Sequence, residues 1–244
     1  MEFITLGTSH GATVPGRSCS SNLLRVNGVG YMFDCGGNAE GKLTDLNIPI
    51  KDIKCVFISH MHEDHVGALS SIAKRFCFYI KDDCKVEVFM PEEKGIEAFK
   101  VWSEAMHQTL SEERIGFKTV SEGEFFSDEN VKVTAIPNLH MDKGRFPSYS
   151  YMVEAGEKKI LYTGDLWLDF SDYPKILLEE EFDAVVCELV HFDLEKNLDT
   201  ILKTKTKQMI FTHMSPVKAE KILEIKESFP FEVYIAEDGK AFVI

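Results

Sequence analysis

Residues 55–67 of the chain read Cys-Val-Phe-Ile-Ser-His-Met-His-Glu-Asp-His-Val-Gly, an apolar run that leads into four potential metal ligands. The run Cys55–Ile58 is typical of a buried strand. The ligands are His60, His62, Asp64 and His65. Imidazole and carboxylate together suit Zn²⁺, Mn²⁺ or Fe²⁺. In an extended segment the first two histidines point to the same side and can share one ion, while the last two ligands, at the turn into a helix, can face a second.

Strand-like and helix-like segments extend on both sides of this stretch. The dipeptide Asn27-Gly28 favours a tight type I′ hairpin turn between strands Leu23–Val26 and Tyr31–Phe33. The other predicted strands are Phe3–Gly7, Cys55–Ile58, Val86–Met90, Val131–Ile136, Ser148–Val153, Ile160–Tyr162, Ala184–Cys187, Met209–Phe211, Glu232–Ile235 and Ala241–Ile244. The predicted helices are Glu93–His107, Leu194–Lys203 and Val217–Ser228. This pattern predicts one α/β domain over residues 1–244, with two sheets packed together and helices outside.

The composition is that of an ordinary globular protein, with 44% hydrophobic and 27% charged residues. No apolar run approaches the roughly 20 residues that cross a bilayer, and the first residues do not resemble a secretion signal. We therefore expect a cytoplasmic protein without membrane contact, whose six cysteines are reduced thiols. The net charge is −13, and two divalent ions would bring it only to about −9. Such a charge disfavours a large nucleic acid as partner and leaves small anionic substrates open.

The motif His-x-His-x-Asp-His after a strand resembles the signature of the metallo-β-lactamase fold superfamily, and the likeness extends over nearly the whole chain. Its upstream element is matched by Phe33-Asp34-Cys35-Gly36. Its later ligands are matched by His140, by Asp165 in the pair Gly164-Asp165, and by His213, each after a predicted strand. The resemblance implies a four-layer αββα sandwich of two mixed sheets flanked by helices.

The resemblance also implies a pair of divalent ions, Zn²⁺ or Mn²⁺ in the first place and Fe²⁺ as an alternative. Their ligands would be His60, His62 and His140 for one ion, Asp64, His65 and His213 for the other, and Asp165 as the bridge. A hydroxide shared by the two ions would be the nucleophile, because coordination lowers the pKa of water towards 7. Asp34 would hold a ligand in place by a hydrogen bond from outside the centre. The histidine at position 62, in place of an acid, departs from the diiron oxygen-reducing branch and favours hydrolysis.

Within the superfamily, the opening Leu6-Gly7-Thr8-Ser9-His10-Gly11 resembles the loop of the branch that contains tRNA 3′-processing endonucleases and a cyclic phosphodiesterase, with Ser9 as a departure. In that branch an extra histidine protonates the leaving oxygen. His191 occupies the matching position in this chain, and Glu188 would orient its ring. Candidate catalytic residues are therefore Asp64, His191 and Glu188. Only 24 residues separate His140 from Asp165, too few for the tRNA-binding arm that is common there.

These features predict a metal-dependent phosphodiesterase acting on a small or cyclic phosphodiester. Three alternatives stay open: an acyl hydrolase for lactones, thioesters or β-lactams, a tRNA 3′-end endonuclease, and a non-catalytic metal or ligand sensor. Relatives in this branch are often dimers, so a homodimer is compatible with the resemblance. Two features are left undecided, namely whether His10 approaches the metal centre and whether the lysines 203, 205 and 207 contact substrate. His107 is expected at a helix end.

Overall fold

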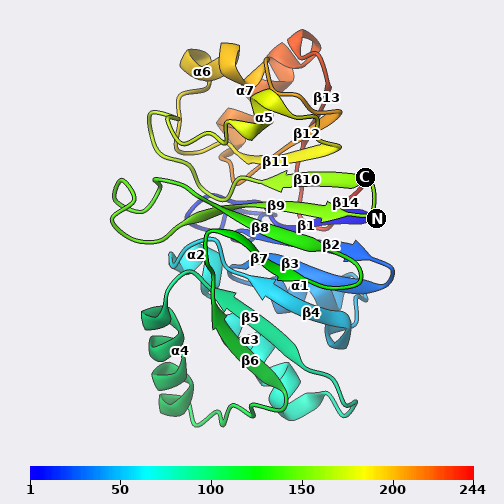
Figure 1. Ribbon diagram of the computed structural model, residues 1–244, viewed down its shortest axis with the longest axis vertical. Coiled ribbons are helices and arrows are strands. Elements are labelled where there is room, and N and C mark those ends of the chain that lie inside the picture. The colour runs from blue at the N-terminus through cyan, green and yellow to red at the C-terminus, as the bar shows by residue number, and fades with distance from the viewer.

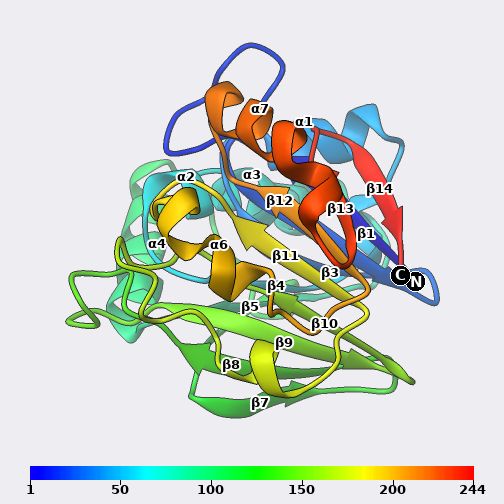
Figure 2. The same ribbon diagram turned by 90° about the horizontal axis from the view of Figure 1, so that it is seen from above.

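The computed structural model describes all residues 1–244 and contains two seven-stranded sheets. The first sheet has the order β14-β1-β2-β3-β4-β5-β6, with bounds Lys240–Val243, Glu2–Gly7, Ser21–Val26, Val29–Cys35, Ile53–Phe57, Val86–Met90 and Ile115–Thr119. The second has the order β13-β12-β11-β10-β9-β8-β7, with bounds Glu232–Ile235, Gln208–Thr212, Ala184–Glu188, Lys158–Tyr162, Tyr149–Ala155, Lys132–Pro137 and Gly123–Ser127. Both sheets mix parallel and antiparallel pairs. The chain ends lie side by side, where β1 pairs with β14 (Figures 1 and 2).

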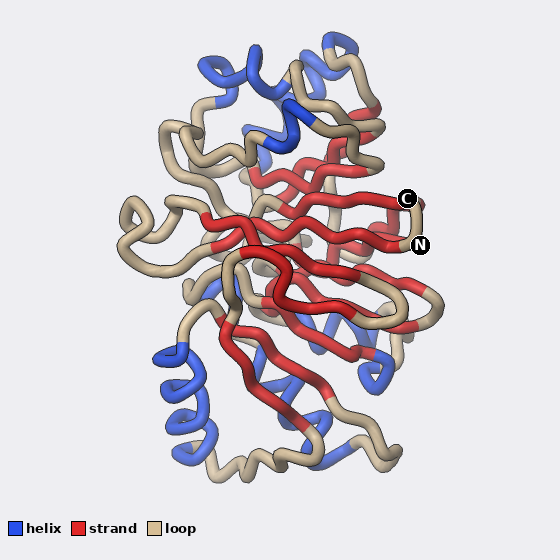
Figure 3. The backbone as a smooth tube through the Cα atoms, in the orientation of Figure 1, coloured by secondary structure: helices blue, strands red, loops and turns tan.

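The helices lie on the outer faces of the two sheets (Figures 1 and 3). The first sheet carries α1 to α4, with bounds Ala39–Asp45, Glu63–Val66, Leu69–Lys74 and Glu93–Ala105. The second carries α5 to α7, with bounds Ile176–Glu179, Leu194–Ile201 and Pro216–Ile225. Short turns of 3₁₀ or π type are Ile50–Asp52, Arg75–Tyr79 and Lys226–Ser228. The predicted four-layer sandwich is confirmed.

Three apolar clusters hold these layers together, one between the sheets and one under each helical layer. Aromatic rings dominate the middle cluster, where the rings of Phe33 and Phe57 in the first sheet both contact Tyr151 of the second, at centroid distances of 5.9 and 6.1 Å. Burying one such ring contributes about 1.5–3 kcal/mol. The Tyr151 hydroxyl also donates to the carbonyl of Ile58, just past β4, at 2.7 Å. The core therefore docks the second sheet onto the strand that leads into the histidine motif.

The predicted elements agree with the structure in type and differ at their ends. Asn27 and Gly28 have φ angles of 51° and 86°, as the expected type I′ turn requires. The predicted helix Glu93–His107 ends at Ala105, because His107 has a left-handed φ of 58° and Gln108 N–H closes the end on the carbonyl of Ser103. The other two predicted helices also end earlier, at residues 201 and 225.

The helix expected after the histidine motif is present as α2 and α3, whereas the short elements α1, α5, β6 and β7 were not expected from the sequence. These segments are four to seven residues long, too short for a clear apolar period. None of the helices is long and apolar enough to span a membrane. All six cysteines are free thiols, as expected.

Candidate metal centre

The predicted ligands gather where parallel strands of both sheets end. In the first sheet β3 and β4 run parallel, and the histidine motif follows β4. In the second sheet β10, β11 and β12 run parallel, and Asp165, His191 and His213 follow them. Carboxyl ends of parallel strands share one edge of a sheet, so each sheet presents its polar residues at one edge. The amide of Tyr149 donates to the carbonyl of Ser59 at 3.0 Å and joins the two edges.

One group of ring nitrogens belongs to His60, His62 and His140. The Ser59 hydroxyl donates to the Asp34 carboxylate at 2.9 Å and therefore accepts from Nδ1–H of His60 at 3.0 Å. The pKa of His60 is well below its ordinary value, mainly because burial disfavours the charged ring, so its Nε2 carries a lone pair.

Two nitrogens face Nδ1 of His62, namely Nε2 of His60 at 3.0 Å and Nε2 of His140 at 3.2 Å. Nδ1 of His140 donates to the carbonyl of Leu166 at 3.3 Å, and burial lowers the pKa of this ring, so its Nε2 is also an acceptor. Nδ1 of His62 can donate to at most one of the two. The unmatched lone pair suits a cation, and tetrahedral Zn²⁺–N bonds of about 2.0–2.1 Å place nitrogens about 3.3 Å apart.

A second group contains Oδ2 of Asp64 and the Nε2 atoms of His65 and His213. The Asp64 oxygen lies 3.4 Å from His65 and 3.8 Å from His213. Nε2 of His65 is buried without a hydrogen-bond partner. A buried, unpartnered nitrogen beside a carboxylate fits a divalent ion as the missing partner.

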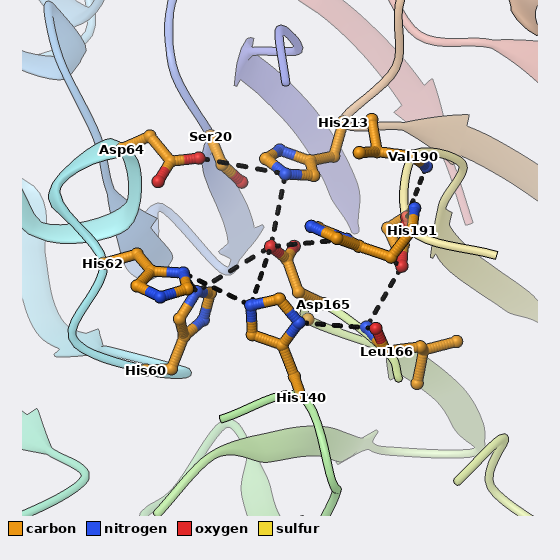
Figure 4. Close-up of polar contacts among 12 residues, drawn as sticks. Ser20, His60, His62, Asp64, His140, Asp165, Leu166, Val190, His191 and His213 are labelled. Atoms are coloured by element: carbon orange, nitrogen blue, oxygen red, sulfur yellow. Dashed lines mark hydrogen bonds and ion pairs between the residues drawn. The ribbon is translucent and has the colours of Figure 1, made fainter. Parts of the chain in front are cut away.

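Asp165 lies between the two groups (Figure 4). Its Oδ2 is 3.3 and 3.2 Å from Nε2 of His65 and His213, and 3.7 and 3.6 Å from Nε2 of His60 and His140. Burial raises the pKa of this carboxyl, but the nearby charges of His213 and His65 outweigh burial and hold the pKa well below its ordinary value. Oδ2 of the ionised Asp165 carboxylate is thus shared by both groups, and Oδ1 of the same carboxylate has no hydrogen-bond partner.

A family model described as Anti-Pycsar protein Apyc1 matches residues 1–229. The chain belongs to the Apyc1 family. It is 24% identical to the Anti-Pycsar protein Apyc1 of Bacillus phage vB_BsuM-Goe3 over 196 residues, which cover 72% of each chain. It is also 32% identical to ribonuclease Z of Bacillus subtilis strain 168 over 143 residues, 57% of this chain and 46% of that protein. The chain thus matches about half the length of the ribonucleases Z to which it is similar.

The fold of this Apyc1-family chain is similar to the crystal structure of the short form of human tRNase Z, with a TM-score of 0.80 and 21% identity over 100% of this chain and 99% of that one. The predicted resemblance to the metallo-β-lactamase fold, in the branch of the tRNA-processing enzymes, is confirmed. The structure also brings the predicted metal ligands together, as the predicted enzyme class, a metal-dependent hydrolase, requires. The roles of individual residues stay predictions.

In this Apyc1-family structure Asp34 hydrogen-bonds to the residues around the ligand cluster. Its carboxylate accepts hydrogen bonds from Ser59 N–H at 2.7 Å, from Nδ1 of His65 at 2.8 Å and from the hydroxyl of Tyr162 at 2.5 Å. Asp34 is fully buried, and its φ of 63° is in the left-handed region. The bond to Nδ1 turns Nε2 of His65 toward Asp64 and Asp165, the orientation that a metal ligand needs.

Glu188 and His191 lie on the other side of Asp165. Nδ1 of His191 is 3.1 Å from Oε1 of Glu188 and 3.7 Å from Oδ2 of Asp165. Glu188 is buried and also accepts from the backbone amides of Leu166 and Val190, so its position is fixed. Burial lowers the pKa of His191, but the hydrogen bond to Glu188 and the charges of both carboxylates outweigh it and raise the pKa above the ordinary value. Glu188 therefore contacts the residue that the sequence assigned to it.

Other residues that the sequence singled out do not join the cluster. His10 is half-buried in the loop between β1 and β2, and no hydrogen bond or ion pair joins its ring to the metal ligands. Lys205 and Lys207 lie before β12, at the amino end of a strand whose carboxyl end carries His213, and they contact the Glu179 carbonyl and Asp183. The patch of lysines 203, 205 and 207 therefore lies at the edge of the sheet opposite the cluster.

Three residues around the cluster were missed in the sequence. Ser59 and Tyr162 hydrogen-bond to Asp34, and Asp172 accepts from two loop amides beside the ligands. The position of Ser59 directly before the motif was a usable signal. The other two belong to no motif, since their partners lie far away in the chain or on the backbone.

Proposed function

We propose that the chain is a metal-dependent phosphodiesterase that acts on a small or cyclic phosphodiester and holds two divalent ions, Zn²⁺ or Mn²⁺. The observation that carries this proposal is the position of Oδ2 of Asp165. This atom lies within 3.8 Å of four ring nitrogens from the two ligand groups, and also of Nδ1 of His191. A shared carboxylate oxygen suits ions about 3.5–4 Å apart, the separation of two-metal hydrolytic sites.

The side chains divide the work of holding such a centre. His60, His62 and His140 would hold one ion, and Asp64, His65 and His213 the other, with Asp165 common to both. The ions, once bound, would supply positive charge beside the phosphate and an activated water. The neutral rings of the first group need not lose a proton to bind, because burial already keeps them uncharged.

His191 is placed to donate a proton to the leaving oxygen. Glu188 takes the hydrogen on Nδ1, so the ring is fixed in orientation and Nε2 remains for substrate, since no group of the chain hydrogen-bonds to it. Nζ of Lys218 donates to the carbonyls of Val190 and Phe192 and so holds the segment on either side of the ring. The raised pKa of His191 favours the protonated ring, the form that a general acid requires.

The net charge and the short interval after His140 support a small substrate. The interval from His140 to Asp165 contains one short loop and the hairpin β9–β10, with no extended arm. A net charge of −13 disfavours the binding of a long polyanion. A small phosphodiester meets only the local field of the centre, where two bound cations would attract it.

The second candidate is a tRNA 3′-end endonuclease. The similarity to ribonucleases Z, at 28–32% identity over 143–156 residues, favours it. The charge and the missing arm weigh against it, and we place it second.

Turnover by the purified protein, loaded with Zn²⁺ or Mn²⁺, separates the candidates. We expect metal-stimulated hydrolysis of bis(p-nitrophenyl) phosphate and of at least one member of a panel of cyclic nucleotides, and none of a tRNA precursor at equal protein concentration. Faster cleavage of the tRNA precursor would support the second candidate. Faster turnover of a lactone, thioester or β-lactam would support an acyl hydrolase, and bound metal without any turnover would support a sensor. Each of these results would overturn the proposed function.

A further inference from the structure

The segment Leu166–Tyr173 follows Asp165 and connects the neighbours of the centre. Its Leu166 carbonyl accepts from Nδ1 of His140 at 3.3 Å, and its Leu166 amide donates to Glu188 at 3.1 Å. The ring of Phe170 lies 4.2 Å from that of Phe192, next to His191. This one segment therefore contacts the elements that carry His140, Glu188 and His191. Figure 4 shows Leu166 beside the ring of His140.

Asp172 closes this segment onto the loop that carries His140. Its Oδ2 accepts from the amide of Leu139 at 2.8 Å, and its two oxygens accept from the amide of Trp167 at 3.0 and 2.9 Å. Leu139 precedes His140 directly, and Trp167 lies two residues after Asp165. The carboxylate is thus a crosslink between the backbones beside two predicted metal ligands.

No cation pairs with Asp172, although its side chain is partly buried. Burial disfavours the charged form, and the pKa of this carboxyl is raised despite the backbone amides. Taking a carboxylate out of water is costly when only backbone amides compensate. An apolar side chain would avoid that cost but leave the two amides without this acceptor.

We infer that Asp172 is a positioning residue that fixes the spacing between His140 and Asp165 by holding Leu139 N–H and Trp167 N–H on one carboxylate. The inference rests on the proposed function in one respect, that these two residues ligate metal. A coordination site tolerates displacements of only about 0.5 Å. His140 belongs only to the group with His60 and His62, whereas Asp165 also contacts His65 and His213, so loss of the crosslink should loosen the first group and leave Asp64, His65 and His213 in place.

The chain offers a matched control in Asp169, three residues earlier in the same segment. Its carboxylate is exposed and accepts only from the neighbouring Ser171. Asp169→Asn removes the same charge at nearly the same place without touching either ligand loop. Two variants probe Asp172 itself: Asp172→Ala removes the crosslink, and Asp172→Asn keeps one oxygen acceptor.

The test titrates metal-free wild type, Asp172→Ala, Asp172→Asn and Asp169→Asn with Co²⁺ and records the visible absorption, with Zn²⁺ calorimetry in parallel and thermal unfolding as the check on folding. We expect two equivalents in wild type and Asp169→Asn. In Asp172→Ala one equivalent should bind as before and the other roughly 10–100-fold more weakly, the usual effect of losing an outer hydrogen-bond partner. Asp172→Asn should fall between wild type and Asp172→Ala.

The outcomes distinguish failure of the inference from failure of the proposed function. If wild type binds no Co²⁺, the proposed metal centre is wrong. If wild type binds two ions and Asp172→Ala binds both equally well, the inference is wrong. It is also wrong if Asp172→Ala and Asp172→Asn lose both ions together with a lowered melting temperature, because the residue would then support the fold and not the spacing.

Discussion

The two sheets contribute to the centre in different ways. After β4 the first sheet places four predicted ligands within six consecutive residues, His60 to His65. The second sheet contributes one at a time, after successive strands, from His140 to His213, 73 positions apart. The first set is local in the chain, whereas the second exists only once β8 to β12 are in register. The centre is therefore half a sequence motif and half a product of topology.

Asp165 is the residue for which this difference matters most, because it belongs to the second set and touches both ligand groups. We expect Asp165→Ala to abolish binding of both ions and to lower turnover by about 10³-fold or more, since the metals supply several kcal/mol of charge stabilisation. By contrast His62→Ala should leave one ion bound. Metal analysis and steady-state kinetics check both variants. An Asp165→Ala protein that still binds two ions would show that Asp165 does not bridge them.

His191 tests whether the second sheet supplies chemistry in addition to ligands. His191→Ala should lower kcat by about 10²-fold and leave metal content unchanged, because a general acid contributes 10²–10⁴-fold. The measurement is turnover of a substrate with a poor leaving group, compared with bis(p-nitrophenyl) phosphate, whose good leaving group needs less protonation. Loss of bound metal in this variant would make His191 a ligand or a structural residue instead.

Asp34 tests how far the first set depends on residues outside its motif. In Asp34→Asn the ring of His65 loses its anionic acceptor, so metal affinity should fall by roughly 10–100-fold. Tyr162→Phe is the milder companion, because three of the four donors to Asp34 remain. Calorimetry with Zn²⁺ gives both affinities. Equal affinities in wild type and Asp34→Asn would show that the motif is self-sufficient.

Asp183 tests the register of the second sheet at the edge away from the centre. It precedes β11 and accepts from Lys207 at 2.7 Å, from Lys158 at 3.0 Å and from the amide of Lys159 at 3.0 Å. Partial burial raises its pKa, but these donors outweigh burial and lower the pKa to about 2. Asp183→Asn should cost about 1 kcal/mol of unfolding free energy at pH 7, a small effect because the lysines are solvated.

That difference depends on pH in a defined direction. An unfolded aspartate has a pKa of about 3.9, so the ionised form stabilises the fold fully above about pH 4, and this contribution is lost as the pH falls towards 2. Denaturant unfolding of wild type and Asp183→Asn at pH 7, 4 and 3 should show a shrinking gap. A gap that is constant with pH would mean that the charge of Asp183 plays no part.

The local half of the centre was predictable from the sequence, and so was much of the fold. Period-two and helical patterns located the strands and the three longer helices, and Asn27-Gly28 located a turn. The short elements β6 and β7 escaped, since Gly116, Lys118 and Thr119 leave β6 only two apolar residues. The assignments of His140, Asp165 and His213 depended on resemblance, because nothing in the local sequence distinguishes a strand-end histidine that faces a centre from one that faces water.

The residues that hydrogen-bond around the ligands could not be predicted from local sequence patterns, for a different reason. Asp34 bonds to Tyr162, 128 positions away, and Asp172 serves backbone amides that carry no side-chain signature. Such contacts are set by how the sheets dock. A pattern search therefore finds ligands more readily than the groups that orient them.

The pair of hydrogen bonds from Tyr149 and Tyr151 to Ser59 and Ile58 links folding to metal affinity. An ion that draws ligands from both sheets binds only the docked arrangement, so binding and docking stabilise each other by the same free energy. A slip of one residue between the sheets, about 3.3 Å, would break both bonds and separate the ligand groups. The metal affinity that we propose would thus measure how completely the two sheets have docked.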